Sequence, residues 1–276
     1  MNNKEIDGGF TGQAGTSQFG KHVWINLLSE AGAVASTEHI LSPFLEALIL
    51  DQENFQGALA SLVGKTIDSY YGAIAPSTDS IVGLIEENER SVSELCALDL
   101  KVAFERNPAW RDYLTPFLYS KGFHAVLFHR VAHWLWGNDR KHLAEYIHGA
   151  ACRLFGVDIH PAAVIGKGLF LDHATGFVVG ETASIGDNVS VLHGVTLGGT
   201  GKESGDRHPI IESGVLLGAH AVVLGRIKIG ANTKVAAGSV VLEDISPNTT
   251  VAGVPARVVR QQSGDLVPAI AMDQYL

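Results

Sequence analysis

The residues best suited to acid–base chemistry lie in two short segments in the second half of the chain. One segment contains Asp172 and His173, and the other contains Arg207 and His208. An imidazole becomes an effective base when a carboxylate holds its other ring nitrogen, and Asp158 is our candidate for that carboxylate. The second segment adds a cation and another imidazole, whose task these residues alone do not define. We therefore predict a proton-transfer site centred on His173.

Both segments interrupt a repeat in which an aliphatic residue returns every six positions. A short fixed period marks a solenoid, and a helical period of 3.6 residues cannot produce it. Glycine or alanine follows several of these positions, as expected where a backbone turns a tight corner. We expect a hexapeptide β-helix with three short strands per turn, which in the known hexapeptide folds is left-handed, against the usual crossover rule. The positions are Ile159, Ile165, Leu171, Val179, Ile185, Val191, Leu197, Ile211, Leu217, Val223, Ile229, Val235 and Val241.

The two interruptions of the repeat coincide with the segments that could carry chemistry. The step from Leu171 to Val179 is eight residues, and the step from Leu197 to Ile211 is fourteen. A repeat fold accepts insertions at its corners, and function usually lies there. Both insertions are therefore candidate parts of the site.

Assigning the repeat positions to three faces predicts which residues stack along the coil. Coils lie roughly 4.8 Å apart, and one corner should carry a polar end followed by a wall of small residues, suited to a long flexible ligand. Asp158 should lie at the same corner as His173. The loop with Arg207 and His208 leaves from another corner, so a shared site would need a neighbouring chain. The predicted column is His173, His193, Ala219 and Ala237.

The pattern divides the chain into four parts and predicts an α+β protein. We expect residues 1–19 to be disordered because they are polar and rich in glycine. Residues 20–157 have helical periodicity and should form an all-α domain, followed by a left-handed parallel β-helix of hexapeptide repeats over residues 158–260. Residues 261–276 look like a C-terminal tail.

Composition excludes several classes of function. The 276 residues are 46% hydrophobic and carry a net charge of -9, so nucleic acid and anionic membranes are poor partners. No apolar run is long enough to span a membrane, and the N-terminus has no signal pattern, so we expect a cytoplasmic protein. The two cysteines, Cys96 and Cys152, are too few for a disulfide framework or a Cys-based metal site. We expect both to be small buried residues and expect no metal.

Several segments in order closely resemble the serine O-acetyltransferase family, over roughly residues 91–257. The repeat alone would be weak support because many acyltransferases share it, whereas the joint occurrence of these segments is specific. They are LDHATG at 171–176, VTLGGTGK at 195–202, GDRHP at 205–209 and AGVPAR at 252–257, with DIHPAA at 158–163, KGFHA at 121–125 and Asp99 upstream.

The resemblance implies transfer of the acetyl group of acetyl-CoA to the hydroxyl of L-serine, giving O-acetyl-L-serine for L-cysteine biosynthesis. By motif, His173 would be the general base and Asp158 its orienting partner. Asp172 and Asp99 would bind the amino group of serine, and Arg207 and His208 its carboxylate. Coenzyme A would lie along the coil edge, with Gly199, Thr200, Ala219, Ala237 and Arg257 as its contacts.

The resemblance also implies an assembly and a regulator. The family forms trimers or dimers of trimers, with active sites between adjacent subunits, so the helical domain should serve oligomerisation and part of the serine site. L-cysteine would inhibit at the serine site. Cysteine synthase would bind the C-terminal tail, but this sequence ends at Leu276, where the family pattern runs on to an isoleucine, and this departure counts against the complex.

Other functions fit parts of the pattern. A γ-type carbonic anhydrase is also a left-handed β-helix, and His173, His193 and His208 match its histidine count but not its spacing. A hexapeptide acetyltransferase for sugars or antibiotics shares the repeat, and a scaffold without activity is a third alternative. His129 and His133 have the spacing of a helical metal pair, although their aromatic surroundings favour a packed helix.

Overall fold

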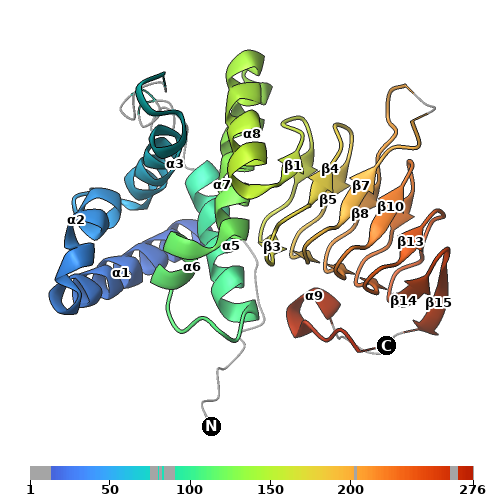
Figure 1. Cartoon of the computed structure of the whole chain (residues 1–276). Helices are drawn as coiled ribbons and strands as arrows, with labels where there is room; N and C mark the ends of the chain where they lie inside the picture. Colours follow the sequence, from blue (N-terminus) through green and yellow to red (C-terminus); the bar gives the residue numbers. More distant parts are fainter. Residues whose placement is uncertain are drawn as a thin grey trace, which may run out of the picture.

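The computed structural model describes residues 14–74, 80, 83, 91–201, 204–261 and 267–275. Helices form one side of the molecule, and a coil of short strands forms the other (Figure 1). The helices are α1 (Ala14–Thr37), α2 (Ser42–Leu45), α3 (Phe55–Tyr71), α5 (Ser91–Arg106), α6 (Leu114–Tyr119), α7 (Lys121–Gly137) and α8 (Lys141–Phe155), with short helical turns at η1 (His39–Leu41), η2 (Glu46–Leu50) and η3 (Gly72–Ile74).

Local signals explain how several helices begin and end. The Asn54 side chain accepts a hydrogen bond from the Gly57 N–H at the start of α3, and Ser120 does the same for the Phe123 N–H at the start of α7. Helix α8 ends at Gly156, which has the left-handed conformation that favours glycine. The expectation of disorder over residues 1–19 is wrong for residues 14–19, which belong to α1; the rest of that segment lies outside the described residues.

The β-helix begins at Asp158, directly after the turn that ends α8. Its strands form three parallel faces, the architecture predicted from the repeat. The first face stacks β1 (Asp158–Ile159), β4 (Val178–Val179), β7 (Thr196–Gly198), β10 (Val222–Leu224) and β13 (Val240–Val241). The second stacks β2 (Val164–Ile165), β5 (Ser184–Ile185), β8 (Ile210–Ile211) and β11 (Lys228–Ile229).

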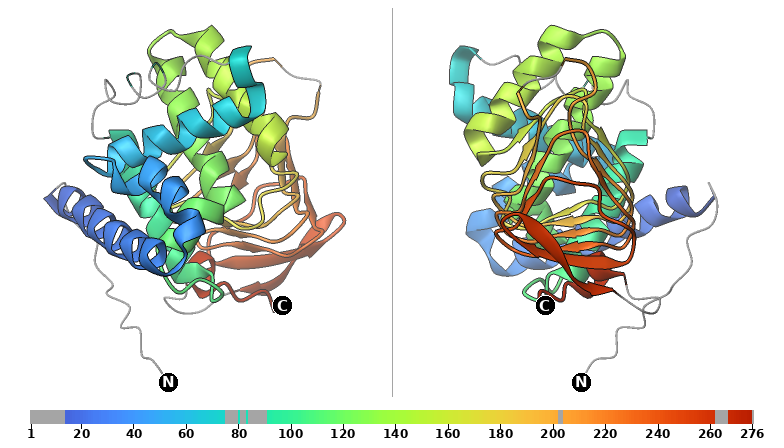
Figure 2. Two further views of the ribbon diagram at one scale, coloured as in Figure 1. Left: turned by 60° about the vertical axis from the view of Figure 1, so that its left-hand side comes forward. Right: turned by 90° about the vertical axis from the view of Figure 1, so that its right-hand side faces the viewer.

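The third face carries the residues that precede the predicted column. It stacks β3 (Phe170–Leu171), β6 (Ser190–Val191), β9 (Leu216–Leu217) and β12 (Lys234–Val235), and is completed by β14 (Thr249–Gly253) and the antiparallel β15 (Ala256–Gln261). Leu171 pairs with Val191, Val191 with Leu217, and Leu217 with Val235, as the spacing predicts. These aliphatic residues point inward, and Val191, Leu217 and Val235 are completely buried. The right-hand view of Figure 2 looks along the coil from its C-terminal end.

Helix α7 packs tightly against the first coil. A Cβ atom at Gly122 would lie only 1.8 Å from the carbonyl oxygen of Leu171, so no other residue fits this contact without movement. Arg106 at the end of α5 donates to the hydroxyl of Ser190 at 2.9 Å and to the carbonyl oxygen of Val189 at 3.3 Å. The helical domain and the β-helix are therefore joined by buried contacts and not by a linker.

The last described residues fold back onto the coil. Helix α9 (Pro268–Ala271) lies beside the third face, where the Ser190 hydroxyl donates to the carbonyl oxygen of Ala269 at 2.7 Å. Lys234 donates to the carbonyl oxygens of Asp273 and Tyr275. Of the helices in the described part of the chain, none is both long and apolar enough to cross a membrane.

Candidate active site

His173 lies on the corner between β3 and β4, where the first insertion occurs. His173 and Ala174 both have left-handed backbones, with φ of 59° and 60°. This backbone conformation is uncommon for residues with a side chain, and such residues occur often at functional sites. Hydrogen bonds from Ala174 N–H to Asp172 O and from Thr175 N–H to His173 O, both 2.7 Å, hold the turn. The imidazole consequently points outward, and 74% of its side-chain surface is exposed.

Among the described residues, the side chains of Asp172 and His193 contact the imidazole of His173. Its Nε2 lies 3.6 Å from a carboxylate oxygen of Asp172. Its ring meets that of His193 edge-on, with centroids 6.0 Å apart, as the predicted column requires. The predicted register continues to Ala219, because the N–H of the next residue, His220, donates to the carbonyl oxygen of His193 at 2.9 Å. The ring of His220 also lies beside His193, with centroids 4.8 Å apart. Sequence reasoning missed His220 because its left-handed backbone, with φ of 58°, turns its ring toward His193.

Asp158, the predicted partner of His173, is bonded to another histidine. Its carboxylate lies 2.9 Å from Nε2 of His148 on α8. The hydrogen bond from His148 is the main cause that lowers the pKa of Asp158, and the same bond raises the pKa of His148 to about 10. Within one chain, then, Asp158 contacts His148 while His173 contacts Asp172, and the Asp158–His173 pair stays a prediction. The sequence carried a signal for this contact. His148 lies on α8, and α8 ends directly before β1, which begins at Asp158.

Asp99 lies in the junction between the two domains, away from solvent. Its two carboxylate oxygens accept hydrogen bonds from Nε and Nη2 of Arg130, at 3.1 and 3.2 Å, and one also accepts the Leu169 N–H at 2.9 Å. Arg130 in turn donates to the carbonyl oxygens of Ile165 and Gly166, at 2.5 and 2.6 Å. Only 2% of Asp99 is exposed. Within the described chain these bonds hold Asp99 in the domain junction, and its contact with the amino group of serine stays a prediction.

Arg207 and His208 are held by the corner between the first and second faces. Arg207 pairs with Glu181 at 2.8 Å, and Nδ1 of His208 lies 2.9 Å from the hydroxyl of Thr182. His208 packs over Gly180, where any Cβ atom would come within 2.0 Å of its Nε2. Burial, and then the charge of Arg207, lowers the pKa of His208, which favours the neutral imidazole. The structure thus places these two residues beside each other but brings neither to His173.

The expected coenzyme contacts lie along the coil. The N–H of Gly238, directly after Ala237, donates to the carbonyl oxygen of Ala219 at 2.8 Å, so the two alanines belong to adjacent coils at one corner. Gly199 and Thr200 directly follow β7, at the start of the long loop. Arg257 is exposed on β15, where it pairs with Glu243 at 3.1 Å. The small side chains leave room for a long ligand along the coil. The exposed guanidinium of Arg257 can bind a phosphate group of that ligand.

Comparison with known proteins adds independent support. A family model of the serine acetyltransferase N-terminal region matches residues 23–127, and a model of six bacterial transferase hexapeptide repeats matches residues 208–243. A curated serine acetyltransferase of Salmonella typhimurium (strain LT2) is 47% identical over 256 residues, covering 92% of each chain.

Solved structures with the same fold carry informative ligands. A serine acetyltransferase in complex with cysteine has a TM-score of 0.88 and 44% identity, covering 93% of this chain and 99% of its own. The enzyme of Brucella abortus strain S19 with coenzyme A gives 0.83 and 45%, covering 88% and 96%, and that of Neisseria gonorrhoeae with serine gives 0.82 and 44%, covering 86% and 97%. By sequence, by fold and over nearly its whole length, this chain belongs to the serine acetyltransferase family.

Proposed function

We propose that His173 is the general base with which this enzyme transfers the acetyl group of acetyl-CoA to the hydroxyl of L-serine. Nε2 of His173 removes the hydroxyl proton as the serine oxygen attacks the thioester carbonyl carbon. The carbon–sulfur bond then breaks, and the imidazolium returns its proton to the thiolate of coenzyme A. A serine hydroxyl is scarcely ionised at neutral pH, so such a base contributes roughly 10²- to 10⁴-fold in rate.

The observation that carries this proposal is the Asp172–His173 pair on its strained, exposed corner. Serine carries its hydroxyl and its ammonium group on adjacent carbon atoms. A base and a carboxylate 3.6 Å apart can therefore bind the two groups of one serine molecule. Asp172 holds the ammonium group by charge and hydrogen bonding. The other ring nitrogen of His173, Nδ1, remains for an orienting carboxylate, the role we assign to Asp158.

The carboxylate of serine needs a cation, which we propose comes from another subunit. Arg207 and His208 are fastened to Glu181 and Thr182 within their own chain. Their loop leaves from a different corner of the coil from the one that carries His173. A homo-oligomer, either a trimer or a dimer of trimers, would place this loop against the His173 corner of its neighbour. Coenzyme A would lie along the edge between them, contacted by Gly199, Thr200, Ala219, Ala237 and Arg257.

No serine or cysteine nucleophile lies beside His173 among the described residues, so we propose direct transfer in a ternary complex. Cys96 is completely buried, and Cys152 lies on α8 beside His148. We also propose inhibition by L-cysteine, which carries the same ammonium and carboxylate groups as serine and would bind the same residues. Two unpaired thiols suit a reducing compartment, which supports a cytoplasmic location.

The function is tested by supplying acetyl-CoA with a panel of acceptors and measuring the free thiol released. We expect turnover with L-serine and little with sugars or aminoglycosides, with inhibition as L-cysteine is added. Turnover with a sugar and not with serine would overturn the assignment. Hydration of carbon dioxide, assayed on the same sample, would instead favour the carbonic anhydrase alternative.

A further inference from the structure

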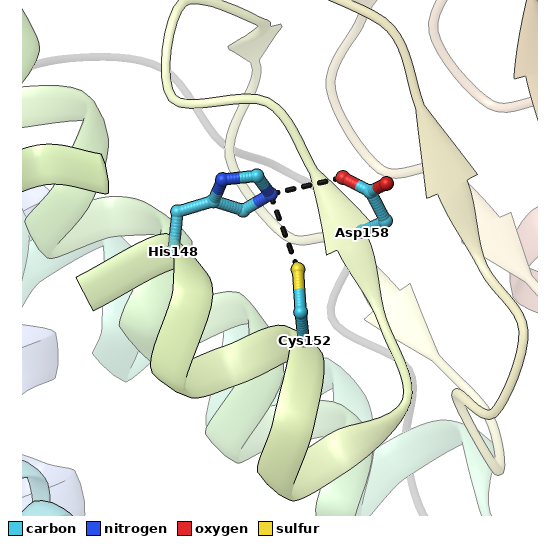
Figure 3. A group of neighbouring side chains, drawn as sticks. All are labelled: His148, Cys152 and Asp158. Atoms are coloured by element: carbon cyan, nitrogen blue, oxygen red, sulfur yellow. Dashed lines mark hydrogen bonds and ion pairs between the residues drawn. The ribbon is translucent and has the colours of Figure 1, made fainter. Parts of the chain in front are cut away.

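Three side chains with metal-binding atoms converge where α8 meets the first coil. His148 and Cys152 lie four residues apart on α8 and therefore on the same face of the helix. Asp158 reaches them from β1, after the chain reverses at Gly156. In Figure 3 the imidazole of His148 points at both the thiol and the carboxylate. One atom from each residue lies within 4.8 Å of the others.

The distances in this cluster are close to those around a bound zinc ion. Zinc with tetrahedral geometry has ligand bonds of about 2.0–2.1 Å to nitrogen and oxygen and about 2.3 Å to sulfur, so its ligand atoms lie roughly 3.3–3.6 Å from one another. Nε2 of His148 is 3.3 Å from Sγ of Cys152 and 2.9 Å from Oδ1 of Asp158. Movements of a few tenths of an ångström would bring these two distances from His148 to those around an ion, and the Cys152 and Asp158 atoms lie within 4.8 Å of each other.

The surroundings of His148 match those of a metal ligand. Its other ring nitrogen, Nδ1, lies 3.2 Å from a carboxylate oxygen of Glu145, one turn earlier on α8. Histidine ligands almost always donate from their second nitrogen to such a group, which fixes the tautomer and the ring orientation. Glu145 therefore leaves Nε2 as the atom directed toward the cluster.

A second observation comes from the small cavity beside the cluster. His129 and His148 both line it, together with Val157, Ile159 and small residues of α7 and α8. Only 4% of His129 is exposed, and its Nδ1 has no hydrogen-bond partner among the described residues. A buried nitrogen without a hydrogen-bond partner is energetically unfavourable unless another group, such as a water molecule bound to a metal ion, forms a hydrogen bond with it. The cluster thus has three ligands, a supporting carboxylate and room for a further polar ligand.

We propose that His148, Cys152 and Asp158 bind a divalent cation of the zinc class, with the fourth position left to water. Binding releases the thiol proton of Cys152 and any proton on Nε2 of His148 to solvent, and no electron is transferred. The ion binds the carboxylate of Asp158, which can then no longer orient His173, so the ion inhibits acetyl transfer. This consequence rests on the proposed role of Asp158. The two cysteines are too few for a Cys-based site, but a mixed site needs only Cys152.

The site is tested directly by spectroscopy with cobalt(II), which replaces zinc and absorbs when bound to a thiolate. Untagged, reduced, metal-free full-length protein is titrated with cobalt(II) and then with zinc(II). We expect one thiolate-to-cobalt band that saturates at one equivalent and disappears as zinc displaces cobalt. Cys152→Ser abolishes the band, and Glu145→Gln weakens cobalt affinity by about 10- to 100-fold because it removes the supporting carboxylate.

Matched controls separate the site from other thiols and imidazoles. Cys96→Ala removes the other cysteine, and His142→Gln removes an exposed histidine of α8; both should keep the band, whereas His148→Gln should lose it. Absence of the band in the unaltered protein, or its survival in Cys152→Ser, overturns the site.

Activity is a separate readout. Zinc should inhibit serine acetylation by the unaltered enzyme at least 10-fold more strongly than it inhibits Cys152→Ser, whose uninhibited rate should be unchanged. A cobalt band without this inhibition would keep the site, overturn the inhibitory consequence and count against the role of Asp158. Loss of serine acetylation without any metal would instead overturn the proposed function.

Discussion

Charged groups are buried and paired in the domain junction, whereas they are open to solvent at the His173 corner. In the junction, Asp99 is 2% exposed and Arg130 is 4% exposed, and each is bonded to the other and to backbone groups. At the corner, the His173 side chain is 74% exposed and has one carboxylate 3.6 Å away. The buried pair comes from α5 and α7 and contacts the first coil of the β-helix, which also carries the His173 corner. One uses its charges to hold the domains together, and the other leaves them open to a ligand.

Two aspartates of similar appearance in the sequence therefore have different surroundings in the structure. A carboxylate buried with all its partners present is costly to disturb, because the remaining charge would have no water. A carboxylate at an open corner can exchange water for the ammonium group of a substrate. Burial and partner count, more than residue type, separate Asp99 from Asp172.

The largest expected effect comes from the open corner. His173→Ala should lower kcat for serine acetylation by at least about 10²-fold, because the proton of the serine hydroxyl then has no base. Coenzyme A affinity, measured by calorimetry, and the melting temperature should change little, since the side chain is exposed. Unchanged turnover would remove the base assignment.

In the junction, the main loss should be in stability. Arg130→Ala leaves the carboxylate of Asp99 buried without a cation, with only backbone N–H donors, which should lower the free energy of unfolding by about 3–5 kcal/mol in chemical denaturation. The control is Arg257→Ala, which breaks an exposed ion pair and should cost about 1 kcal/mol or less.

Asp99→Asn tests separately whether Asp99 binds serine. If Asp99 is structural, the KM for serine, measured on the folded fraction of the variant, stays within about twofold of that of the unaltered enzyme. A large rise in KM without loss of stability would restore Asp99 as a substrate ligand.

A smaller packing effect is expected where α7 touches the first coil. Gly122→Ala forces a methyl group into the carbonyl oxygen of Leu171 and should cost about 1–3 kcal/mol, measured from the denaturation midpoint. Gly137→Ala is the matched control on the same helix because nothing lies within 4 Å of its Cβ position. Equal stability of the two variants would show that α7 and β3 are less tightly packed than the structure indicates.

The smallest effect concerns the pH dependence of the Asp158–His148 pair. The folded pKa of His148 is raised to about 10, so its stabilisation is complete below its unfolded value of about 6.5 and is lost as pH rises through 10. The pKa of Asp158 is lowered, so its share is lost as pH falls below about 3.8.

His148→Gln should therefore lower the melting temperature by about 2–4 °C between roughly pH 4 and 6.5, with the difference vanishing above pH 10. The control is His142→Gln, an exposed residue of α8, which should show no such profile. A difference between His148→Gln and the unaltered enzyme that is constant across pH would contradict the ion pair.

Much of the fold could be predicted from the sequence because a hexapeptide repeat fixes both the strands and their register. The pairing of Leu171 with Val191 follows from counting sixes, and the position of His173 follows from the step of eight residues. Contacts between the domains could not be found in this way. The bonds of Asp99 to Arg130 and of Asp158 to His148 depend on how helices dock against the coil, which no local period specifies.

We propose that the open corner becomes an active site only beside another subunit. The direct test is to co-express His173→Ala with Arg207→Ala, each inactive alone, and to measure serine acetylation by the purified mixed oligomer. If each site joins His173 of one subunit to Arg207 of the next, random assembly restores about a quarter of the sites and of the activity. If both residues serve a site within one chain, no site is intact and the mixture stays inactive, which would contradict a site shared between subunits.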